Sequence, residues 1–546
     1  MIWVGVEVPS LPVIYARQLP DLSLCVLRGG KSPAAVDDMK KQFLVLLFIL
    51  FCLILTYDLA FHSYIKGAFH REYKGDITTR TDFNSYNDSF LNWYHRGVYS
   101  HNLDYLPAYV GRMPAYPFFI GLHYVLFGPN WYTKIIPYTQ IVIHAISVLY
   151  MFLLLYEKTG NRKFSFSFSL LYGFLPFVVN FNSWGQGESL STALVVMLSY
   201  YLFSLRHANR YRTFILIGVL ISIVVFLRPY LAVLIPLFYV FYFTFKDELI
   251  SIKWKNLVVF TLALSLFFLP WIVRNYIVFG KFIPLKGINA GYLAGYLQYE
   301  TDDFLSVLKW SHAVTVIPFT ENYTARIVLD NTPADAYSQL QNLIHLDSEE
   351  KAILWQALVL MDRCGYHKNP DRIKLVNKLL ISDNCNTAIK KNFEFLLDYY
   401  KKKYPLRYFF INPIKRIFWY MFNTRSYLIL YYTFRDDALT LFQRLLKLSF
   451  WGVNFFIVAG GFLEGILMCV NSKDWKKNMS WVLLFLGVLI NIVYISCVYP
   501  YNANYRFFLQ NIPVLFILMS FFVYRVHPYF MAYFTQKIEQ SLPDGR

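Results

Sequence analysis

The sequence predicts an all-α polytopic membrane protein, and three observations support this fold class. Of the 546 residues, 56% are hydrophobic and only 16% are charged, and the mean hydropathy is positive. A soluble protein of this length would carry more charge. Apolar segments of about 20 residues, the length that crosses a bilayer, recur along the chain with short basic loops between them. We therefore expect a bundle of about ten transmembrane helices.

Ten segments have the composition of a spanning helix. They are 42–62, 134–156, 164–181, 187–205, 213–228, 230–245, 257–277, 445–470, 479–498 and 507–525. The apolar stretch from Pro114 to Phe127 is short, contains two prolines in its first turn and ends at Gly128-Pro129. It is therefore left out of the spanning set and interpreted as a re-entrant or juxtamembrane helix of the first outer loop.

Basic residues set the expected orientation. With ten spans, Lys40 and Lys41 and the basic loops near residues 158–163, 206–212, 246–255 and 473–477 all fall on one side. The positive-inside rule makes that side cytoplasmic. The formal charge of +18 is spread over these short loops, which suits anionic lipid head groups and excludes nucleic-acid binding.

The chain then divides into five parts. Residues 1–41 are a cytoplasmic tail or follow a misassigned start, because Met39-Lys40-Lys41 before an apolar run is how a membrane protein often begins. Residues 42–280 form a transmembrane module with its first outer loop at 63–133. Residues 281–441 form a mainly helical non-cytoplasmic insertion, in which 347–361 and 371–380 have helical apolar spacing. Residues 442–525 are C-terminal transmembrane helices and 526–546 a cytoplasmic tail.

Two cysteines lie in the insertion, Cys364 and Cys385. An oxidising compartment would permit a disulfide between them, and two free thiols are the alternative.

The first outer loop contains a helical stripe that starts with a carboxylate. Asp82, Tyr86, Phe90 and Trp93 are spaced by three or four residues, so a helix places them on one face. The positive end of that helix would keep Asp82 ionised and able to accept a proton. The aromatic face, lying at the bilayer surface, could receive an amphipathic substrate. A solvated loop acid is the alternative for Asp82.

Basic and acidic residues follow at the expected outer ends of helices. Arg112, before a proline-fixed turn, offers planar bidentate donors suited to a phosphate, with interfacial snorkelling as the alternative. Glu188, Arg228, Arg274-Asn275 and Arg506 mark four later helix ends. An ionisable side chain in apolar surroundings costs roughly 2.5–3.5 kcal/mol on insertion scales, so it usually has a partner or a function. The alternative is a structural ion pair such as Glu188 with an arginine.

In this order the residues resemble the GT-C superfamily of membrane glycosyltransferases. The run from Asp82 through Tyr86, Gly97 and Tyr99 to Arg112-Met113-Pro114-Ala115-Tyr116-Pro117 and Phe127-Gly128 is similar to the first outer loop of the branch that contains dolichyl-phosphate-mannose–protein mannosyltransferases and aminoarabinose transferases. Glu188, Arg228-Pro229, Pro270-Trp271 with Arg274-Asn275, and Arg506 with Pro513 are similar in order and topology. The resemblance covers roughly 42–290 and, loosely, 479–525, whereas 291–441 matches nothing in that family.

The resemblance implies a GT-C-like bundle that acts as an inverting glycosyltransferase. It would move a hexosyl or pentosyl group from a polyprenyl-phosphate donor to a hydroxyl of a lipid, glycan or protein acceptor. Asp82 would be the general base, and Arg112, Arg274, Arg228 and Arg506 would hold the donor phosphate. Tyr86, Glu188, Asn275 and Tyr116 would contact substrate or support the site.

The resemblance also sets expectations for cofactor and compartment. Asp82 is followed by Phe83, where many family members pair two carboxylates, so Glu300, Asp302 and Asp303 are candidates for a second carboxylate, with a solvated acidic turn as the alternative. No cofactor is certain, and a divalent cation is left open. The expected location is a bacterial inner (cell) membrane, with the active site facing the periplasm or exterior.

Two other function classes stay open. A polysaccharide polymerase or ligase would also use a lipid-linked sugar at the outer face. A transporter or flippase for lipid-linked sugars would bind near the bilayer midplane, often between inverted repeats. No repeat relates the two halves, and the helix interiors are expected to lack mid-span acids. His144 is the main exception and is expected to be a satisfied core histidine.

Overall fold

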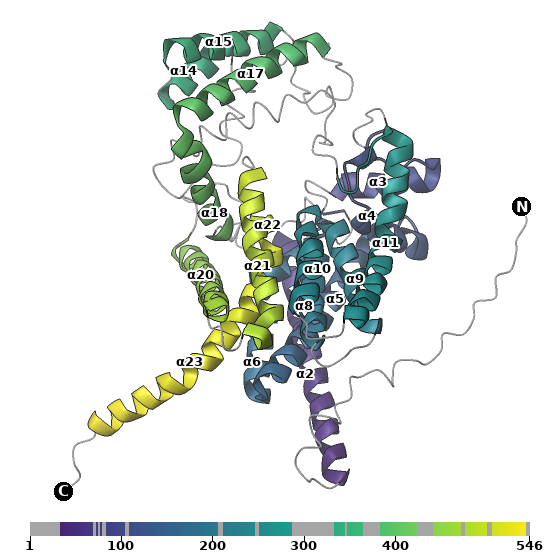
Figure 1. Cartoon of the computed structure of the whole chain (residues 1–546), viewed down its shortest axis with the longest axis vertical. Helices are drawn as coiled ribbons and strands as arrows, with labels where there is room; N and C mark the ends of the chain where they lie inside the picture. Colours follow the sequence, from purple (N-terminus) through teal and green to yellow (C-terminus); the bar gives the residue numbers. More distant parts are fainter. Residues whose placement is uncertain are drawn as a thin grey trace, which may run out of the picture. The chain divides into compact units, whose positions relative to one another are not determined.

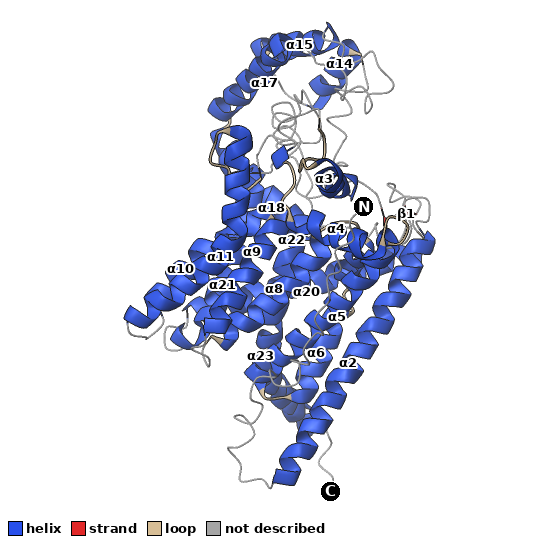
Figure 2. Cartoon of the chain, turned by 90° about the vertical axis from the view of Figure 1, so that its right-hand side faces the viewer, coloured by secondary structure: helices blue, strands red, loops and turns tan. Residues whose placement is uncertain are grey.

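The computed structural model describes residues 33–68, 73–74, 77–78, 83–103, 109–205, 211–245, 250–286, 332–343, 347–363, 383–422, 440–470, 475–498 and 505–541. Apart from a pair of two-residue antiparallel strands, β1 (Tyr73–Lys74) and β2 (Ile77–Thr78), the regular structure in these ranges is helical (Figure 2). The expected all-α class is therefore confirmed. The chain divides into two compact units, residues 1–53 and 54–546.

Six of the described helices are long and apolar enough to cross a membrane. They lie in α2 (Pro33–Ala68), α5 (Tyr132–Thr159), α11 (Ile250–Phe279), α20 (Leu441–Val470), α21 (Trp475–Val498), and the run of η8 (Leu509–Asn511) and α23 (Ile512–Ser541). A seventh is added if α6 (Arg162–Gly173) and the bent continuation through α7 (Pro176–Val179) and η4 (Asn180–Ser183) are one span. The protein is thus a multi-pass membrane protein, and the number of ten spans stays a prediction.

The remaining expected spans coincide with shorter apolar helices. These are α8 (Glu188–Ser204), α9 (Tyr211–Leu227), and the pair η5 (Pro229–Val233) and α10 (Leu234–Phe245). The stretch left out of the spanning set forms α4 (Ala115–Phe127), which ends at Gly128 with a φ of 73° that favours glycine. Its 13 residues span about 20 Å, less than the bilayer core of about 30 Å.

Several helices differ from the sequence expectation, by a bend or by their bounds. The segment 164–181 is bent by 49° between Gly173 and Pro176, because a proline has no backbone N–H and disfavours a helical residue before it. The first helix begins at Pro33 rather than at residue 42, and the last continues to Ser541, past the expected end at 525.

Small residues allow close helix contact near the C-terminus. A Cβ added at Gly461 of α20 would lie 2.6 Å from the carbonyl oxygen of Leu515 in α23. Membrane helices associate through such contacts, because lipid supplies no hydrophobic driving force between them. Glycine is therefore required at this crossing.

The insertion contains α14 (Pro333–Leu343), α15 (Ser348–Arg363) and α17 (Asp383–Lys403), with α15 packed against both of the others (Figure 1). The predicted helix at 347–361 is confirmed by α15. Asp347 and Glu350 cap it reciprocally, each side chain accepting the other's backbone N–H at 3.1 and 2.9 Å. Hydrogen bonds from Lys403 and Tyr399 of α17 hold the pKa of Asp347 below its usual range.

The other expectations for the insertion fall outside the described residues. These are the helix at 371–380, Cys364 and the side chain of Cys385, so the disulfide stays a prediction.

Candidate functional site

The predicted stripe of the first outer loop is a helix, α3 (Phe83–Arg96). Tyr86 and Phe90 are buried on it, whereas Trp93 is 42% exposed. Asp82, the expected base, lies outside the described residues, immediately before the first residue of α3. From Tyr86 to Trp93 the stripe is therefore helical as predicted, whereas the place of Asp82 on it and its role stay predictions.

The first turn of α3 packs against the segment that leads into α8. A Cβ added at Gly185 would overlap the ring of Phe83, so the absence of a side chain permits this contact. Phe83, Tyr86, Tyr116, Leu190 and Leu227 belong to one buried cluster. The cluster joins α3, α4, the start of α8 and the end of α9, which are far apart in sequence.

Arg112 lies over this same turn of α3. Its Nε donates to Ser85 Oγ at 2.8 Å, and its guanidinium carbon is 4.5 Å from the ring centroid of Tyr86. Its backbone carbonyl accepts from the hydroxyl of Tyr99 at 3.1 Å. Burial raises the pKa of Tyr99, which keeps that hydroxyl protonated as a donor. Arg112 and Tyr86, two of the residues expected from sequence to bind substrate, are thus in contact.

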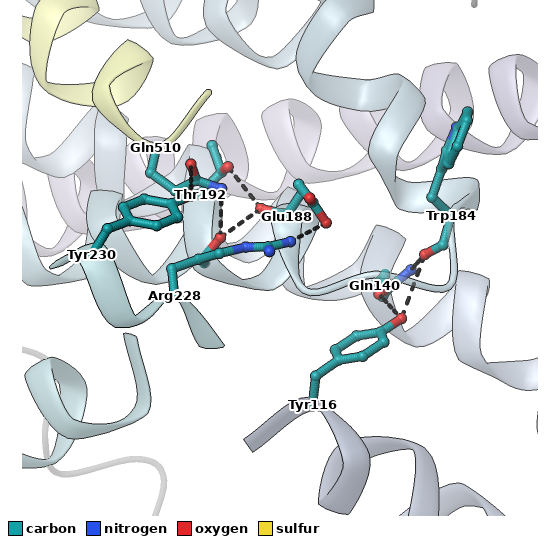
Figure 3. A network of polar contacts seen from close by, with 9 residues as sticks. Tyr116, Gln140, Trp184, Glu188, Thr192, Arg228, Tyr230 and Gln510 are labelled. Carbon is teal, nitrogen blue, oxygen red and sulfur yellow. Dashed lines mark hydrogen bonds and ion pairs between the residues drawn. The ribbon is translucent and has the colours of Figure 1, made fainter. Parts of the chain in front are cut away.

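Tyr116 anchors the segment before Glu188. Its hydroxyl donates to Gln140 Oε1 at 3.0 Å and lies 3.4 Å from the carbonyl oxygen of Trp184 (Figure 3). Gln140 Nε2 in turn donates to the carbonyl oxygens of Asn182 and Trp184, at 2.8 and 3.2 Å. Side chains from α4 and α5 thereby satisfy the backbone of an irregular segment inside an apolar bundle.

Glu188 and Arg228 form a buried ion pair, which is the structural alternative considered for Glu188 (Figure 3). Their side chains are 0% and 7% exposed. Glu188 is the first residue of α8, where the positive end of the helix also stabilises a carboxylate. The hydroxyls of Ser191 and Thr192 donate to the backbone carbonyl of Glu188, at 3.0 and 2.7 Å.

The C-terminal helices are connected to this pair through Gln510. Its side-chain oxygen accepts from Tyr230 at 2.7 Å, and its amide donates to Ser191 Oγ at 3.0 Å (Figure 3). Sequence analysis did not identify Gln510 or Tyr230. Arg506, expected to hold phosphate, lies in α22 (Tyr505–Phe508), and its side chain is outside the described set.

Arg274 contacts the protein backbone. Its Nη atoms donate to the carbonyl oxygens of Tyr99 and Tyr109, at 2.6 and 2.5 Å, and to Asn275 Oδ1 at 2.8 Å. Asn275 donates to the carbonyl oxygen of Ile283 at 2.8 Å. Arg274 and Asn275 therefore fasten the first outer loop and the turn after α11, a positioning role that the sequence pattern did not indicate.

A second buried polar cluster was missed. Asp58 Oδ2 accepts from His144 Nδ1 at 2.7 Å and from Asn182 Nδ2 at 3.2 Å, and all three residues are buried. Asn182 Oδ1 accepts from Ser189, the neighbour of Glu188, at 2.5 Å. His144 is a core histidine as predicted, but only Nδ1 is hydrogen-bonded; its buried Nε2 has no hydrogen-bond partner among the described residues.

Two carboxylates that were not singled out from the sequence lie inside candidate spans. Asp58 lies in the candidate span Lys41–Gly67, and Glu464 lies in α20, where it pairs with Arg525 at 2.6 Å. Both acids were visible in the sequence as single carboxylates within apolar runs, a signal that indicates a partner or a function.

Three expected carboxylates, Glu300, Asp302 and Asp303, fall outside the described residues. Within the described ranges, no group of three or more His, Cys, Asp or Glu side chains could hold a metal ion.

No family model matches the chain, and no curated protein matches it.

Proposed function

We propose that this protein is an integral-membrane glycosyltransferase of the GT-C type. It would transfer a hexosyl or pentosyl group from a polyprenyl-phosphate donor to an acceptor hydroxyl, with inversion, on the periplasmic or exterior face of a bacterial cell membrane. The observation that carries the proposal is the convergence at the first turn of α3. Arg112 contacts Ser85 and Tyr86 there, and Phe83 packs on Gly185, three residues before Glu188.

The proposed chemistry assigns one role to each charged group. Asp82, immediately before α3, takes the proton of the acceptor hydroxyl as that oxygen attacks the anomeric carbon. Arg112 stabilises the phosphate that leaves with the polyprenyl chain, where negative charge develops. Because the bond to phosphate supplies the energy, no nucleotide is consumed at this site. A lipid-linked donor reaches such a site laterally from the bilayer.

Arg228 and Arg274 have different roles in this proposal. Arg228 is paired with the buried Glu188, and Arg274 holds the carbonyl oxygens of Tyr99 and Tyr109. We assign both to positioning: Arg228 fixes the start of α8, and Arg274 fixes the loop that presents Arg112. Among Arg112, Arg228 and Arg274, the three selected arginines whose side chains are described, we therefore propose Arg112 as the phosphate ligand.

The test is sugar transfer by the purified protein in lipid nanodiscs, with a panel of labelled polyprenyl-phosphate sugars. Asp82→Asn is expected to lower the rate by about 10²–10⁴-fold, the contribution of a general base. The matched control is Asp88→Asn, six residues later in the sequence and within α3, which is expected to keep wild-type activity. Equal activity of Asp82→Asn and wild type would remove the assigned base. A product that lengthens by repeated additions would favour the polymerase class.

A lipid-linked sugar transporter is the second candidate, and the buried Asp58–His144 pair is the observation that favours it. Transporters place ionisable residues within spans to couple substrate movement to ions. The test is movement of a fluorescent lipid-linked sugar across proteoliposomes, in wild type and in Asp58→Asn. Movement that requires Asp58, without sugar transfer, would replace the glycosyltransferase proposal.

A further inference from the structure

At the C-terminal end of the insertion, one helical face exposes apolar side chains and the opposite face buries polar ones. After α17 the chain continues through a π-helical turn, η6 (Arg407–Ile411), into α18 (Asn412–Phe422). Every fourth residue from Leu406 is apolar and exposed: Leu406 64%, Phe410 62%, Ile414 51% and Phe418 51%. The opposite face is polar or phenolic and buried: Asn412 0%, Arg416 5% and Tyr420 1%. A helix on a water-soluble surface shows the reverse arrangement.

The exposed face continues onto the surface of a membrane span. The ring of Phe422 lies 6.2 Å from that of Phe418, and 6.2 and 5.8 Å from those of Trp451 and Phe455 in α20. Trp451 and Phe455 are themselves 44% and 42% exposed, as side chains of a span that face lipid are. The two apolar surfaces therefore form one continuous strip.

A hydrogen bond fixes how far along the span α18 reaches. Asn454 Nδ2 donates to the carbonyl oxygen of Met421 at 2.8 Å, and Asn454 is buried. Asn454 lies 13 residues after Leu441, the first residue of the 30-residue helix α20 (454 − 441 = 13). The C-terminal end of α18 thus lies beside the middle of a candidate span, at a level that lipid chains occupy.

The charges of this segment match a membrane surface with anionic lipids. From Tyr399 to Phe422 the sequence has no acidic residue, and its basic residues are Lys401, Lys402, Lys403, Arg407, Lys415 and Arg416. Lys401 and Lys403 form ion pairs with Asp398 and Asp347, and Arg416 is buried. The exposed Lys402 and Arg407 come before α18, on the side where the segment leaves α17. Basic and aromatic residues of this kind bind the head-group region of a bilayer.

We propose that the face of η6 and α18 formed by Leu406, Phe410, Ile414 and Phe418 is a lipid-binding face that inserts into the bilayer beside α20. Phe418 lies deepest, and Arg407 meets anionic head groups. The insertion is thereby anchored to the membrane at its C-terminal end. This inference does not depend on the proposed enzymatic activity.

The test is the collision of spin labels with oxygen, which concentrates in lipid, and with a water-soluble nickel chelate. Labels are placed at Phe418→Cys, Leu406→Cys and, as the matched control, Phe395→Cys, an exposed apolar position (45%) on α17. The protein is reconstituted in vesicles of phosphatidylglycerol and phosphatidylcholine, in a background without the native cysteines. The oxygen-to-nickel collision ratio is expected to be highest at Phe418, intermediate at Leu406 and lowest at Phe395.

Two results would overturn the proposal. The first is a ratio at Phe418 as low as at Phe395, which would place the face in water. The second is an immobilised label at Phe418 with few collisions of either kind, which would mean that protein covers the face. If the cysteine-free background does not fold, cross-linking of the wild-type protein in nanodiscs by a phospholipid with a diazirine in its acyl chain gives the same decision. Lipid contact requires adducts on the peptide that contains Phe418 and none on the peptide that contains Phe395, whereas cover by water or by protein leaves Phe418 without adducts.

The head-group contact has its own test. Replacing phosphatidylcholine with phosphatidylglycerol is expected to raise the thermal midpoint of the wild-type protein. Arg407→Gln with Lys415→Gln should lose much of that increase, whereas Lys351→Gln on α15 should keep it. An unchanged increase in the double variant would remove these basic residues from the lipid contact.

Discussion

Breaking the Glu188–Arg228 ion pair should destabilise the protein in a strongly non-additive way. Both side chains are nearly inaccessible, at 0% and 7% exposure, and the pair joins the start of α8 to the residue after α9. We consider Glu188→Gln, Arg228→Met and the double variant, because these substitutions nearly conserve volume and leave no large cavity.

The expected magnitudes differ between the two single variants. Glu188→Gln leaves a buried guanidinium that cannot give up its proton, so the cost should approach the roughly 3–5 kcal/mol measured for broken buried pairs. Arg228→Met leaves a carboxyl group that can take up a proton, so the cost should fall to about 1–3 kcal/mol, that of a buried polar group without its partner. The double variant has no buried charge at this site and should lose only about 1 kcal/mol.

The assay is the free energy of unfolding, measured by titrating the purified protein with sodium dodecyl sulfate and following tryptophan fluorescence. The matched control is Glu464→Gln, which removes an equally buried acid but leaves Arg525, which is 45% exposed. Because Arg525 is exposed and lies near the end of the candidate span Leu509–Pro528, within reach of water and head groups, that variant should lose about 1 kcal/mol or less. The coupling would be refuted if the losses for Glu188→Gln and Arg228→Met summed to the loss of the double variant within about 0.5 kcal/mol.

Two further predictions concern helix packing and acid stability. Gly461→Ala should destabilise the protein by about 1–3 kcal/mol in the same titration, because its Cβ would lie 2.6 Å from the Leu515 carbonyl oxygen. Gly452→Ala, with nothing within 4 Å of the added Cβ, should cost nothing. Since Lys403 lowers the pKa of Asp347, the stabilisation that this ion pair gives to the contact between α15 and α17 should be fully present above about pH 3.8. It should be lost progressively as the pH falls from there through the lowered pKa of the folded protein. Hydrogen exchange of α15, corrected for the intrinsic rate, should show this acid-dependent loss in wild type but not in Asp347→Asn.

Most of the helix positions could be predicted from sequence because the bilayer imposes a simple requirement. A spanning segment must satisfy its backbone internally and be apolar over about 20 residues, and both properties are local. The residues at which helices begin and end were less predictable where contacts with neighbouring elements determine them. The bend before Pro176 could have been predicted, because the effect of a proline on a helix is local. In contrast, nothing in the sequence pattern indicated that α23 continues to Ser541.

The contacts of the site were only partly predictable. The stripe from Asp82 to Trp93 depends on spacing along one helix, and α3 confirms its helical form from Tyr86 to Trp93. The pairing of Glu188 with Arg228 was one of the alternatives, because an unpaired charge in lipid is expensive. The sequence could not indicate that Arg274 binds the backbone of Tyr99, since any carbonyl oxygen can be the partner of a guanidinium.

The missed pair of Asp58 and His144 shows why a single polar residue in a span is difficult to interpret alone. Each residue by itself fits a solvated helix end or a satisfied core position. They are 86 residues apart, and only the packing of α2 beside α5 brings Oδ2 and Nδ1 to 2.7 Å. The same carboxylate also accepts from Asn182, and Asn182 accepts from Ser189, so one buried charge positions the residue next to Glu188. The hydrogen bonds to Oδ2 thus offset part of the cost of burying Asp58, whose Oδ1 has no hydrogen-bond partner among the described residues, and they also fix the segment that leads into α8.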